Sequence, residues 1–383
     1  MKIPLRYSIR NLMRRKVRTL LTLFAVVLVV AVSVVMFAFA GGLLNSARNS
    51  GSPDNIIVID RKAANQTFSK ISKTDYNLLK GLPQIRKNAL GEPLISPETL
   101  QDTRVSVGEH ENRPGVVRGV SEKLFEVNTL LRMVEGEPPS PGRNLVVGSL
   151  THTALGVPRE SLVVGNEIVI SNDTWKIVGR FDASGTAMDS EILMDLNDSM
   201  AVFVRDSYSS ALIKLEHEGE MPTLIQSLNS RNDIQVKAVA EREYYRDLAE
   251  GFERIILLAV FLAVIATIGG LVSGMNTMYA SVLGRIREIG TLKTLGYPPK
   301  DIVQSFVLES TTLALMGGAI GMALAWQANG ISTKFNKGAF SINVDEWALL
   351  AGLVVALVIG IFGALFPAIK GARMKIPEAL HYS

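Results

Sequence analysis

The hydrophobic positions of this chain are gathered into four long runs, with one long and several short polar segments around them. We expect transmembrane helices at residues 20–44, 251–280, 303–328 and 347–369. A helix of roughly 20 apolar residues crosses a bilayer core, so each run is long enough. The first run is also too long for the apolar part of a signal peptide, which has roughly 7–15 residues. The pattern therefore predicts an α-helical membrane protein with four spans.

Residues 45–250, between the first and second spans, alternate short apolar stretches with turn residues. A helix start is expected at Ser72, before an apolar pattern that Gly81 and Pro83 end. The strand signals are Asn55–Asp60, Val116–Val120, Leu145–Val147, Glu167–Ile170, Trp175–Val178, Glu191–Met194 and Leu212–Leu215. A helix signal at Met221–Leu228 follows the last of them, and Asn172 and Asp173 suggest a hairpin between Ile170 and Trp175. We expect a large α+β extracytoplasmic domain, either undivided or made of two subdomains that meet near residues 115–145.

The segment that leads into the second span, residues 241–254, is strongly charged and has high helix propensity. Its only breaker is Gly251. It is expected to extend the second span outward as one rod, and 14 residues at about 1.5 Å each give about 20 Å. The alternative is a separate helix that closes the domain.

Positive charge lies on three short flanks of the predicted spans. Residues 1–19 contain seven basic and no acidic residues, and 285–302 and 370–383 also carry a basic excess. Residues 45–250, in contrast, contain 23 basic and 29 acidic residues. Short loops rich in Lys and Arg stay in the cytoplasm, so both termini are expected inside, with 45–250 and the short loop 329–346 outside. The pI of about 9.1 therefore does not indicate nucleic-acid binding.

The cytoplasmic flanks differ in their predicted structure. Residues 1–19 are read as an amphipathic lead-in or as a merely basic flank, and 370–383 as a tail. Residues 285–302 predict a short helix, because Ile286, Ile289 and Leu292 recur at helical spacing. Gly296 is placed to cap this helix, and the prolines at 298 and 299 prevent its continuation. A loop so specific is expected to dock on a partner.

Residues that would carry catalysis or bind a metal are not found together. The chain has no cysteine and no phosphate-binding glycine loop of the type GxxxxGK[ST]. Its four histidines are isolated from one another. These observations predict no catalytic, cofactor-binding or metal site in this chain.

Glu309 is the only ionisable residue clearly inside a predicted span. Such a residue indicates function by default, either as a structural or coupling group that pairs with a loop arginine or snorkels, or as part of a proton or substrate path. Small residues at Gly270 and Gly274, and at Gly317 and Gly321, have the spacing of close helix contacts, between spans or between subunits.

Three stretches resemble the FtsX-like permeases of ABC transporters. They are RNLMRRKVRTL at residues 10–20, RIREIGTLKTLG at residues 285–296, and PAIKGARMKIPEAL at residues 367–380. Residues 119–136 and 164–179 of the outer domain are similar to the same group, which includes the macrolide exporter and the lipoprotein-release permeases. One departure is Glu137, where many relatives have arginine after the glycine.

The resemblance implies a permease driven by a separate ABC ATPase subunit, which would bind the ATP and Mg²⁺. A second permease copy, most simply a homodimer, the lipid of a bacterial inner membrane, a periplasmic adaptor and an outer-membrane channel are the further partners it implies. The loop helix would be the coupling helix, with the apolar residues filling a groove of the ATPase. Its coupling residues would be Arg285, Arg287, Glu288, Ile289, Gly290, Lys293, Leu295 and Gly296.

The predicted function is therefore the permease subunit of an ATP-driven exporter or extraction machine that moves its outer domain. The alternative is a mechanotransmitter that transports nothing and regulates an extracytoplasmic enzyme such as a cell-wall hydrolase. A sensor or adhesion anchor without an ATPase leaves the docking loop unexplained. The substrate is not indicated by any residue.

Overall fold

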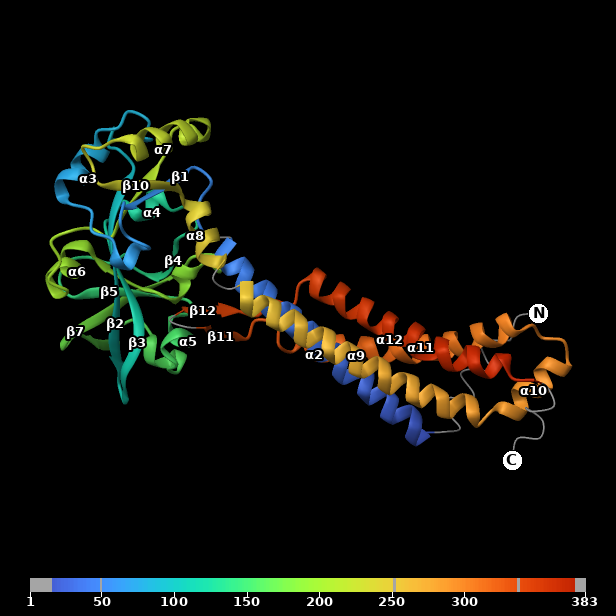
Figure 1. The fold of residues 1–383 in the computed structure, drawn as a ribbon. Coiled ribbons are helices and arrows are strands. Elements are labelled where there is room, and N and C mark those ends of the chain that lie inside the picture. Colours follow the sequence, from blue (N-terminus) through green and yellow to red (C-terminus); the bar gives the residue numbers. More distant parts are fainter. Residues whose placement is uncertain (1–15, 49, 251–252, 336–337, 376–383) are drawn as a thin grey trace. The chain divides into compact units, whose positions relative to one another are not determined.

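A computed structural model describes residues 16–48, 50–250, 253–335 and 338–375 (Figure 1). The chain divides into two compact units. The helical unit contains Met1–Gly41, Arg254–Ile331 and Ile342–Ser383, and the sheet unit contains Gly42–Glu253 and Ser332–Ser341. Most of the amphipathic lead-in expected at residues 1–19, and the end of the tail, lie outside the described residues.

Four long apolar helices could cross a membrane. They are α2 (Lys16–Arg48), α9 (Glu253–Leu283), α11 (Pro299–Trp326) and α12 (Glu346–Arg373). Each is long and apolar enough to cross a bilayer, and α11 is the least apolar of the four. The helices overlap the four runs seen in the sequence and extend beyond most of their ends. The protein is therefore a multi-pass membrane protein with four spans.

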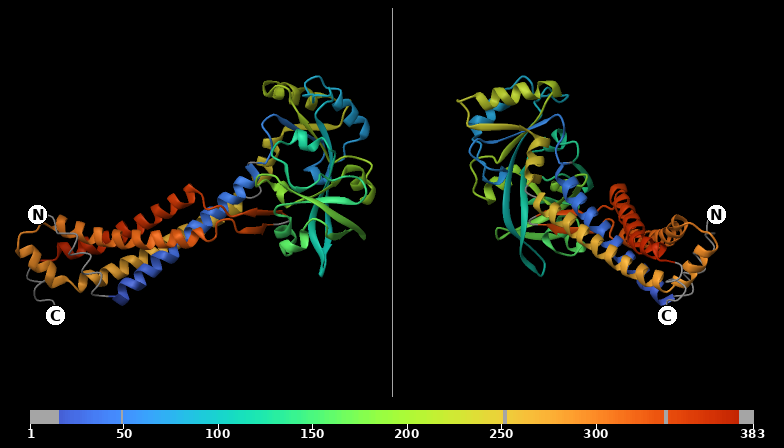
Figure 2. Two further views of the ribbon diagram at one scale, coloured as in Figure 1. Left: turned by 180° about the vertical axis from the view of Figure 1, so that it is seen from behind. Right: turned by 45° about the vertical axis from the view of Figure 1, so that its right-hand side comes forward.

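Glycines bring these helices into close contact. A Cβ atom on Gly317 would lie 3.0 Å from Val26 of α2, and one on Gly321 would lie 2.7 Å from the carbonyl oxygen of Val27. A Cβ atom on Gly270 of α9 would lie 3.0 Å from Ile359 of α12. Helices α2 and α9 run side by side, as Figure 2 shows. The glycine spacings thus serve contacts between spans of one chain, which was one of the two alternatives.

The predicted rod before the second span is seen as two helices, α8 (Glu241–Glu250) and α9. Their join, residues 251–252, lies outside the described residues. Whether the two form one continuous helix therefore stays a prediction.

The sheet unit is built on a mixed ten-stranded sheet. Its strand order is β10-β1-β9-β2-β3-β8-β5-β7-β4, and β6 pairs with both β2 and β7. The strands are β1 (Asn55–Asp60), β2 (Ile95–Val107), β3 (His110–Val120), β4 (Arg132–Gly136), β5 (Asn144–Gly148), β6 (Glu167–Ile170), β7 (Asp173–Asp182), β8 (Ile192–Asp195), β9 (Ser210–Lys214) and β10 (Val236–Ala240). Because β6 joins β7 back to β2, six of the strands close into a barrel-like ring.

Each part of this sheet has a core of its own, and a third core is shared between them. The ring encloses apolar side chains such as Leu145, Trp175 and Met194. Strands β10, β1, β9 and the start of β2 are instead covered by helices, with α3 (Lys73–Lys80) and α7 (Met221–Ser230) on one face and α4 (Leu124–Val127) and α8 on the other. The remaining short elements are α5 (Thr151–Leu155), α6 (Leu196–Val202), η2 (Gln66–Phe68), η3 (Arg159–Leu162), η4 (Ala187–Ser190) and η5 (Glu218–Glu220).

A division of the domain near residues 115–145 is wrong. The sheet runs without interruption through β3. One apolar cluster also joins side chains of β1 and β9 to those of β3, β5 and β8. The beginning of β2 pairs with β9 at Ile95–Glu98, and its end pairs with β6 at Val105 and Ser106. Residues 42–253 therefore form one α+β domain around a single sheet, which was the other alternative.

Each predicted strand overlaps a strand of the sheet. The predicted hairpin between β6 and β7 is present, with Ser171 and Asn172 in the left-handed region. Strands β2, β4 and β10 were missed. So was a hairpin of β11 (Ser332–Phe335) and β12 (Gly338–Ser341) in the segment expected to be a plain polar loop. This hairpin belongs to the sheet unit and contacts α5 and η4.

Candidate functional site: the helix between the second and third membrane helices

The loop at residues 285–302 forms the predicted helix, α10 (Ile286–Thr294). Arg285 is its N-cap residue, and Gly296, at φ 86°, follows its C-cap. The Gly296 amide donates to the carbonyl of Lys293, and the Tyr297 amide donates to that of Leu292. This pair of bonds is the Schellman motif, which requires a left-handed residue after the helix. The predicted role of Gly296 as a cap is confirmed.

One face of α10 is buried within the helical unit. Ile286 and Ile289 are each 2% exposed, and Gly290 is also buried. Ile289 packs in a cluster with Met278 and Val282 of α9, Ile302 and Phe306 of α11, and Ala364, Ala368 and Ala372 of α12. The apolar stripe of the loop helix is therefore used to seat it on three membrane helices of its own chain.

Arg285 is fixed by an ion pair with Glu309 of α11. Its two terminal nitrogens donate to the two carboxylate oxygens, at 2.7 and 2.9 Å. The guanidinium carbon also lies 5.6 Å from the centre of the Phe306 ring. A planar guanidinium matches a carboxylate in this paired geometry, which gives direction as well as energy. The pairing of Glu309 with a loop arginine, one of the two alternatives for this residue, is observed.

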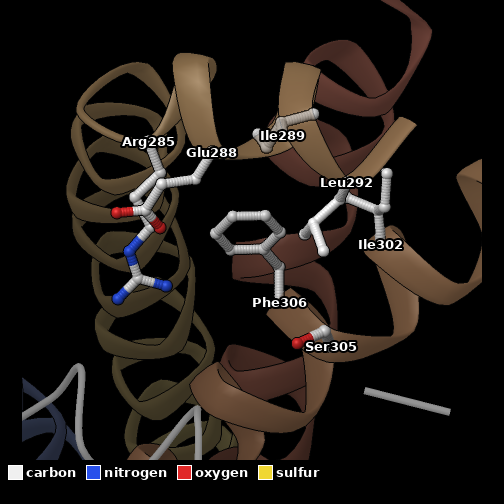
Figure 3. A pocket seen from close by; sticks show the side chains of 7 residues that line it. All are labelled: Arg285, Glu288, Ile289, Leu292, Ile302, Ser305 and Phe306. Atoms are coloured by element: carbon white, nitrogen blue, oxygen red, sulfur yellow. The ribbon is translucent and has the colours of Figure 1, made fainter. Parts of the chain in front are cut away.

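A small cavity of about 20 Å³ opens between α10 and α11 beside this pair (Figure 3). About one water molecule would fit in such a volume. Its lining residues are Arg285, Glu288, Ile289, Leu292, Ile302, Ser305 and Phe306. The cavity marks a joint between helices and is too small for a substrate.

Lys293 holds the other end of α10. Its ammonium group donates to the carbonyls of Ala372, at 2.9 Å, and Met374, at 2.5 Å. Ala372 lies in the last turn of α12 and Met374 is its C-cap residue. The carbonyls at a helix C-terminus have no partner within the helix and carry partial negative charge. Lys293 therefore caps α12, a role that the sequence did not indicate.

The eight residues predicted for coupling are thus divided by the structure. Arg287, Glu288, Leu295 and Gly296 are exposed, and Leu295 is 69% exposed. Ile289 and Gly290 are buried, and Arg285 and Lys293 bind groups of the same unit. The expectation that Ile289 fills a groove on another protein is wrong for this conformation, because its side chain is already enclosed.

A second polar cluster, inside the sheet unit, was not predicted. Arg118 of β3 is 2% exposed and donates to Glu98 of β2 at 2.7 Å and to Glu191 at 2.6 and 2.9 Å. In the sequence these residues look like ordinary surface charges, because nothing local indicates that they meet. Within the part of the chain that the structure describes, no group of three or more histidine and acidic residues could hold a metal ion.

Comparison with known proteins finds two family matches along the chain. Residues 19–231 match the MacB-like periplasmic core domain, and residues 260–376 match the FtsX-like permease C-terminal domain. The first match covers more than half of the chain.

Curated relatives are similar over most of this chain. A "Macrolide export ATP-binding/permease protein MacB" of Hahella chejuensis is 24% identical over 95% of this chain and 58% of its own length. A "Probable export ATP-binding/permease protein" of Pseudomonas fluorescens is 26% identical over 73% of the chain and 41% of its own length. An uncharacterized ABC transporter permease of Methanocaldococcus jannaschii is 27% identical over 60% of each chain. The chain thus spans about half the length of these relatives.

Among solved structures, the periplasmic region of MacB from Actinobacillus actinomycetemcomitans aligns with 54% of this chain at 12% identity and a TM-score of 0.39. The two family matches correspond to the two kinds of structure in the chain, a sheet domain after the first membrane helix and three further membrane helices. The chain therefore belongs to the family of ABC transporter permeases that join a MacB-like periplasmic core domain to an FtsX-like C-terminal domain.

Proposed function

We propose that this chain is the permease subunit of an ATP-driven export system and that α10 is its contact with a separate ATPase. The main observation behind the proposal is that both ends of α10 are bound to other membrane helices. An ion pair fixes its beginning and a lysine fixes its end. A helix held at both ends can pass a displacement to the membrane helices, whereas a flexible loop would absorb it.

The contact surface of α10 consists of Arg287, Glu288, Leu295 and Gly296, which are exposed. The buried residues Ile289 and Gly290 pack α10 against the helical unit and so fix the direction in which this exposed surface faces. The relatives' names, which combine ATP binding, permease and export in one protein, support both the energy source and the direction of transport. We place the sheet unit outside and both termini inside a bacterial inner membrane, because the basic flanks then all lie in the cytoplasm.

Co-expression of the chain with its ATPase subunit tests this function. Glu288→Lys reverses a charge on the exposed face and is expected to lower the amount of ATPase that co-purifies by at least about tenfold, with membrane insertion unchanged. Lys237→Glu reverses an exposed charge on β10 and serves as the matched control. Equal recovery of the ATPase with Glu288→Lys and with the control would refute the coupling role of α10.

A further inference from the structure

The chain passes between the helical and sheet units four times, after residues 41, 253, 331 and 341. These crossings are covalent connections through which a movement of the membrane helices can reach the sheet unit. Their contacts inside the sheet unit therefore decide whether they move separately or together.

The first crossing and the hairpin meet directly. A Cβ atom on Gly42 would lie 2.7 Å from the carbonyl oxygen of Ser341 and 3.2 Å from the ring of Phe340. Strand β12 also contacts η4, whose Ala187 amide donates to the hydroxyl of Ser50 at 3.1 Å. The segment after α2 and the hairpin thus share the same neighbours.

The same segment is bound to the start of α8, just before the second crossing. The carboxylate of Glu241 accepts hydrogen bonds from the Ser52 amide and from the Asn55 side chain, each at 2.9 Å. Gly51, at φ 99°, leaves no room for a side chain, since a Cβ atom would lie 2.9 Å from the backbone of Glu241. We call the contact among Gly51, Ser52, Asn55 and Glu241 the junction.

The junction leads straight into the sheet. Asn55 is the first residue of β1, and Ala240, the last residue of β10, precedes Glu241. These two strands are antiparallel neighbours, with Ile56 opposite Ala240. The junction therefore joins the strand that follows the first span to the helix that precedes the second.

The side chain of Glu241 is buried, and burial disfavours the ionised form of its carboxyl group. It is 2% exposed, and burial raises its pKa from 4.5 to about 7, against the lowering effect of the bonds from Ser52 and Asn55. Glu98 raises this pKa further and Arg118 lowers it, and the buried Tyr245 and exposed Arg242 lie on the same helix. Two atoms of the junction, Ser52 Oγ and Asn55 Oδ1, are buried with no hydrogen-bond partner among the described residues.

We propose that Ser52, Asn55 and Glu241 are positioning residues of this permease, which hold the two membrane connections of the sheet unit together more tightly when Glu241 is protonated. A closed junction binds the proton more tightly than an open one, in which the carboxylate meets water. By linkage, raising the pH through the window from about 4.5 to about 7 must weaken the closed form. The transmission of movement rests on the proposed function, but the junction itself does not.

Hydrogen exchange of the full chain in lipid nanodiscs tests the junction without any ATPase. After correction for the intrinsic pH dependence, the amides of residues 51–56 are expected to exchange about tenfold faster at pH 8 than at pH 6, which is about the loss of one hydrogen bond. Glu241→Gln keeps an acceptor but cannot ionise, so this difference should vanish. The control Glu243→Gln, an exposed position on the same helix, should retain it.

A pH difference that persists in Glu241→Gln would overturn the proposal. Asn55→Ala provides a second test, because the bond from Asn55 lowers the pKa of Glu241. Its removal should move the pH midpoint of protection upward, and an unchanged midpoint would also overturn the proposal.

Transmission is tested in the complex with the ATPase. The chain has no cysteine, so spin labels can be placed at Lys237→Cys and Trp347→Cys alone. ATP is expected to shift the distance between the labels in the parent chain, and Glu241→Ala should reduce this shift at least about threefold with ATP turnover unchanged. A full shift in Glu241→Ala would refute transmission through the junction. The absence of any shift in the parent chain would instead count against the proposed function, while the exchange experiment still decides the junction.

Discussion

Arg285 and Glu309 are joined by two hydrogen bonds, of 2.7 and 2.9 Å, between the residue that begins α10 and the interior of α11. Their side chains are only 11% and 7% exposed. A displacement of α10 must therefore carry α11 with it or break a buried ion pair. An acidic residue within a membrane helix has here a structural reason that needs no proton pathway.

Replacing Glu309 by glutamine should destabilise the helical unit, because Arg285 then keeps its charge without a counter-ion. Breaking a buried pair from one side costs about 3–5 kcal/mol. We expect a lower thermal midpoint of the chain in nanodiscs and faster cleavage by trypsin around α10. The double variant Arg285→Gln with Glu309→Gln should be more stable than either single variant, and losses that simply add would contradict a direct pairing.

Replacing Lys293 by methionine should loosen the end of α12, since the carbonyls of Ala372 and Met374 lose their donor. Hydrogen bonds to a charged group contribute about 1.5–3 kcal/mol. The amides of residues 368–375 are expected to exchange faster in Lys293→Met and to stay unchanged in Glu288→Lys. Equal exchange of these amides in both variants would contradict a stabilising contact between Lys293 and the end of α12.

The features of this chain that depend on neighbours in sequence could be predicted, and Gly296 is an example. A glycine after an apolar stripe and before two prolines indicates a helix end wherever the helix lies. The four spans follow in the same way from the length of their apolar runs. The hairpin between β6 and β7 follows from the turn residues Asn172 and Asp173, which lie between apolar stretches that end at Ile170 and begin at Trp175.

Features that depend on distant partners could not be predicted. Strand β2 was missed because it contains a proline and several polar residues, and these are buried only through partners elsewhere. Glu98 meets Arg118, and Thr99 bonds to Ser199, which is 100 residues away. The burial of Ile289 was missed for the same reason, because an apolar stripe does not say whether it packs on its own chain or on another.

Close packing between α2 and α11 predicts a strong position effect for alanine. A Cβ atom on Gly321 would lie 2.7 Å from the backbone of Val27, whereas one on Gly269 would meet nothing within 4 Å. Overpacking costs about 1–3 kcal/mol, while alanine for glycine inside a helix gains about 0.5–1 kcal/mol. We expect Gly321→Ala to lower the thermal midpoint in nanodiscs and Gly269→Ala to keep or raise it. The reverse order would contradict the contact.

Arg118 bridges Glu98 and Glu191 inside the sheet unit. Arg118→Met leaves two buried carboxylates without a cation and should cost about 3–5 kcal/mol at pH 8. Burial raises the pKa of the Glu98 carboxyl, and loss of the Arg118 charge removes the main effect that opposes this rise. The stability of Arg118→Met should therefore fall as the pH rises above the unfolded pKa of about 4.3.

Thermal unfolding of the full chain at pH 5 and pH 8 measures this effect. The loss in Arg118→Met should be smaller at pH 5, and adding Glu98→Gln and Glu191→Gln should recover much of the stability at pH 8. Arg143→Met removes an arginine that is 61% exposed and paired with Asp173, so it should cost less than about 1 kcal/mol at either pH. A loss in Arg118→Met that is the same at both pH values would show that the cluster contributes through shape and not through charge.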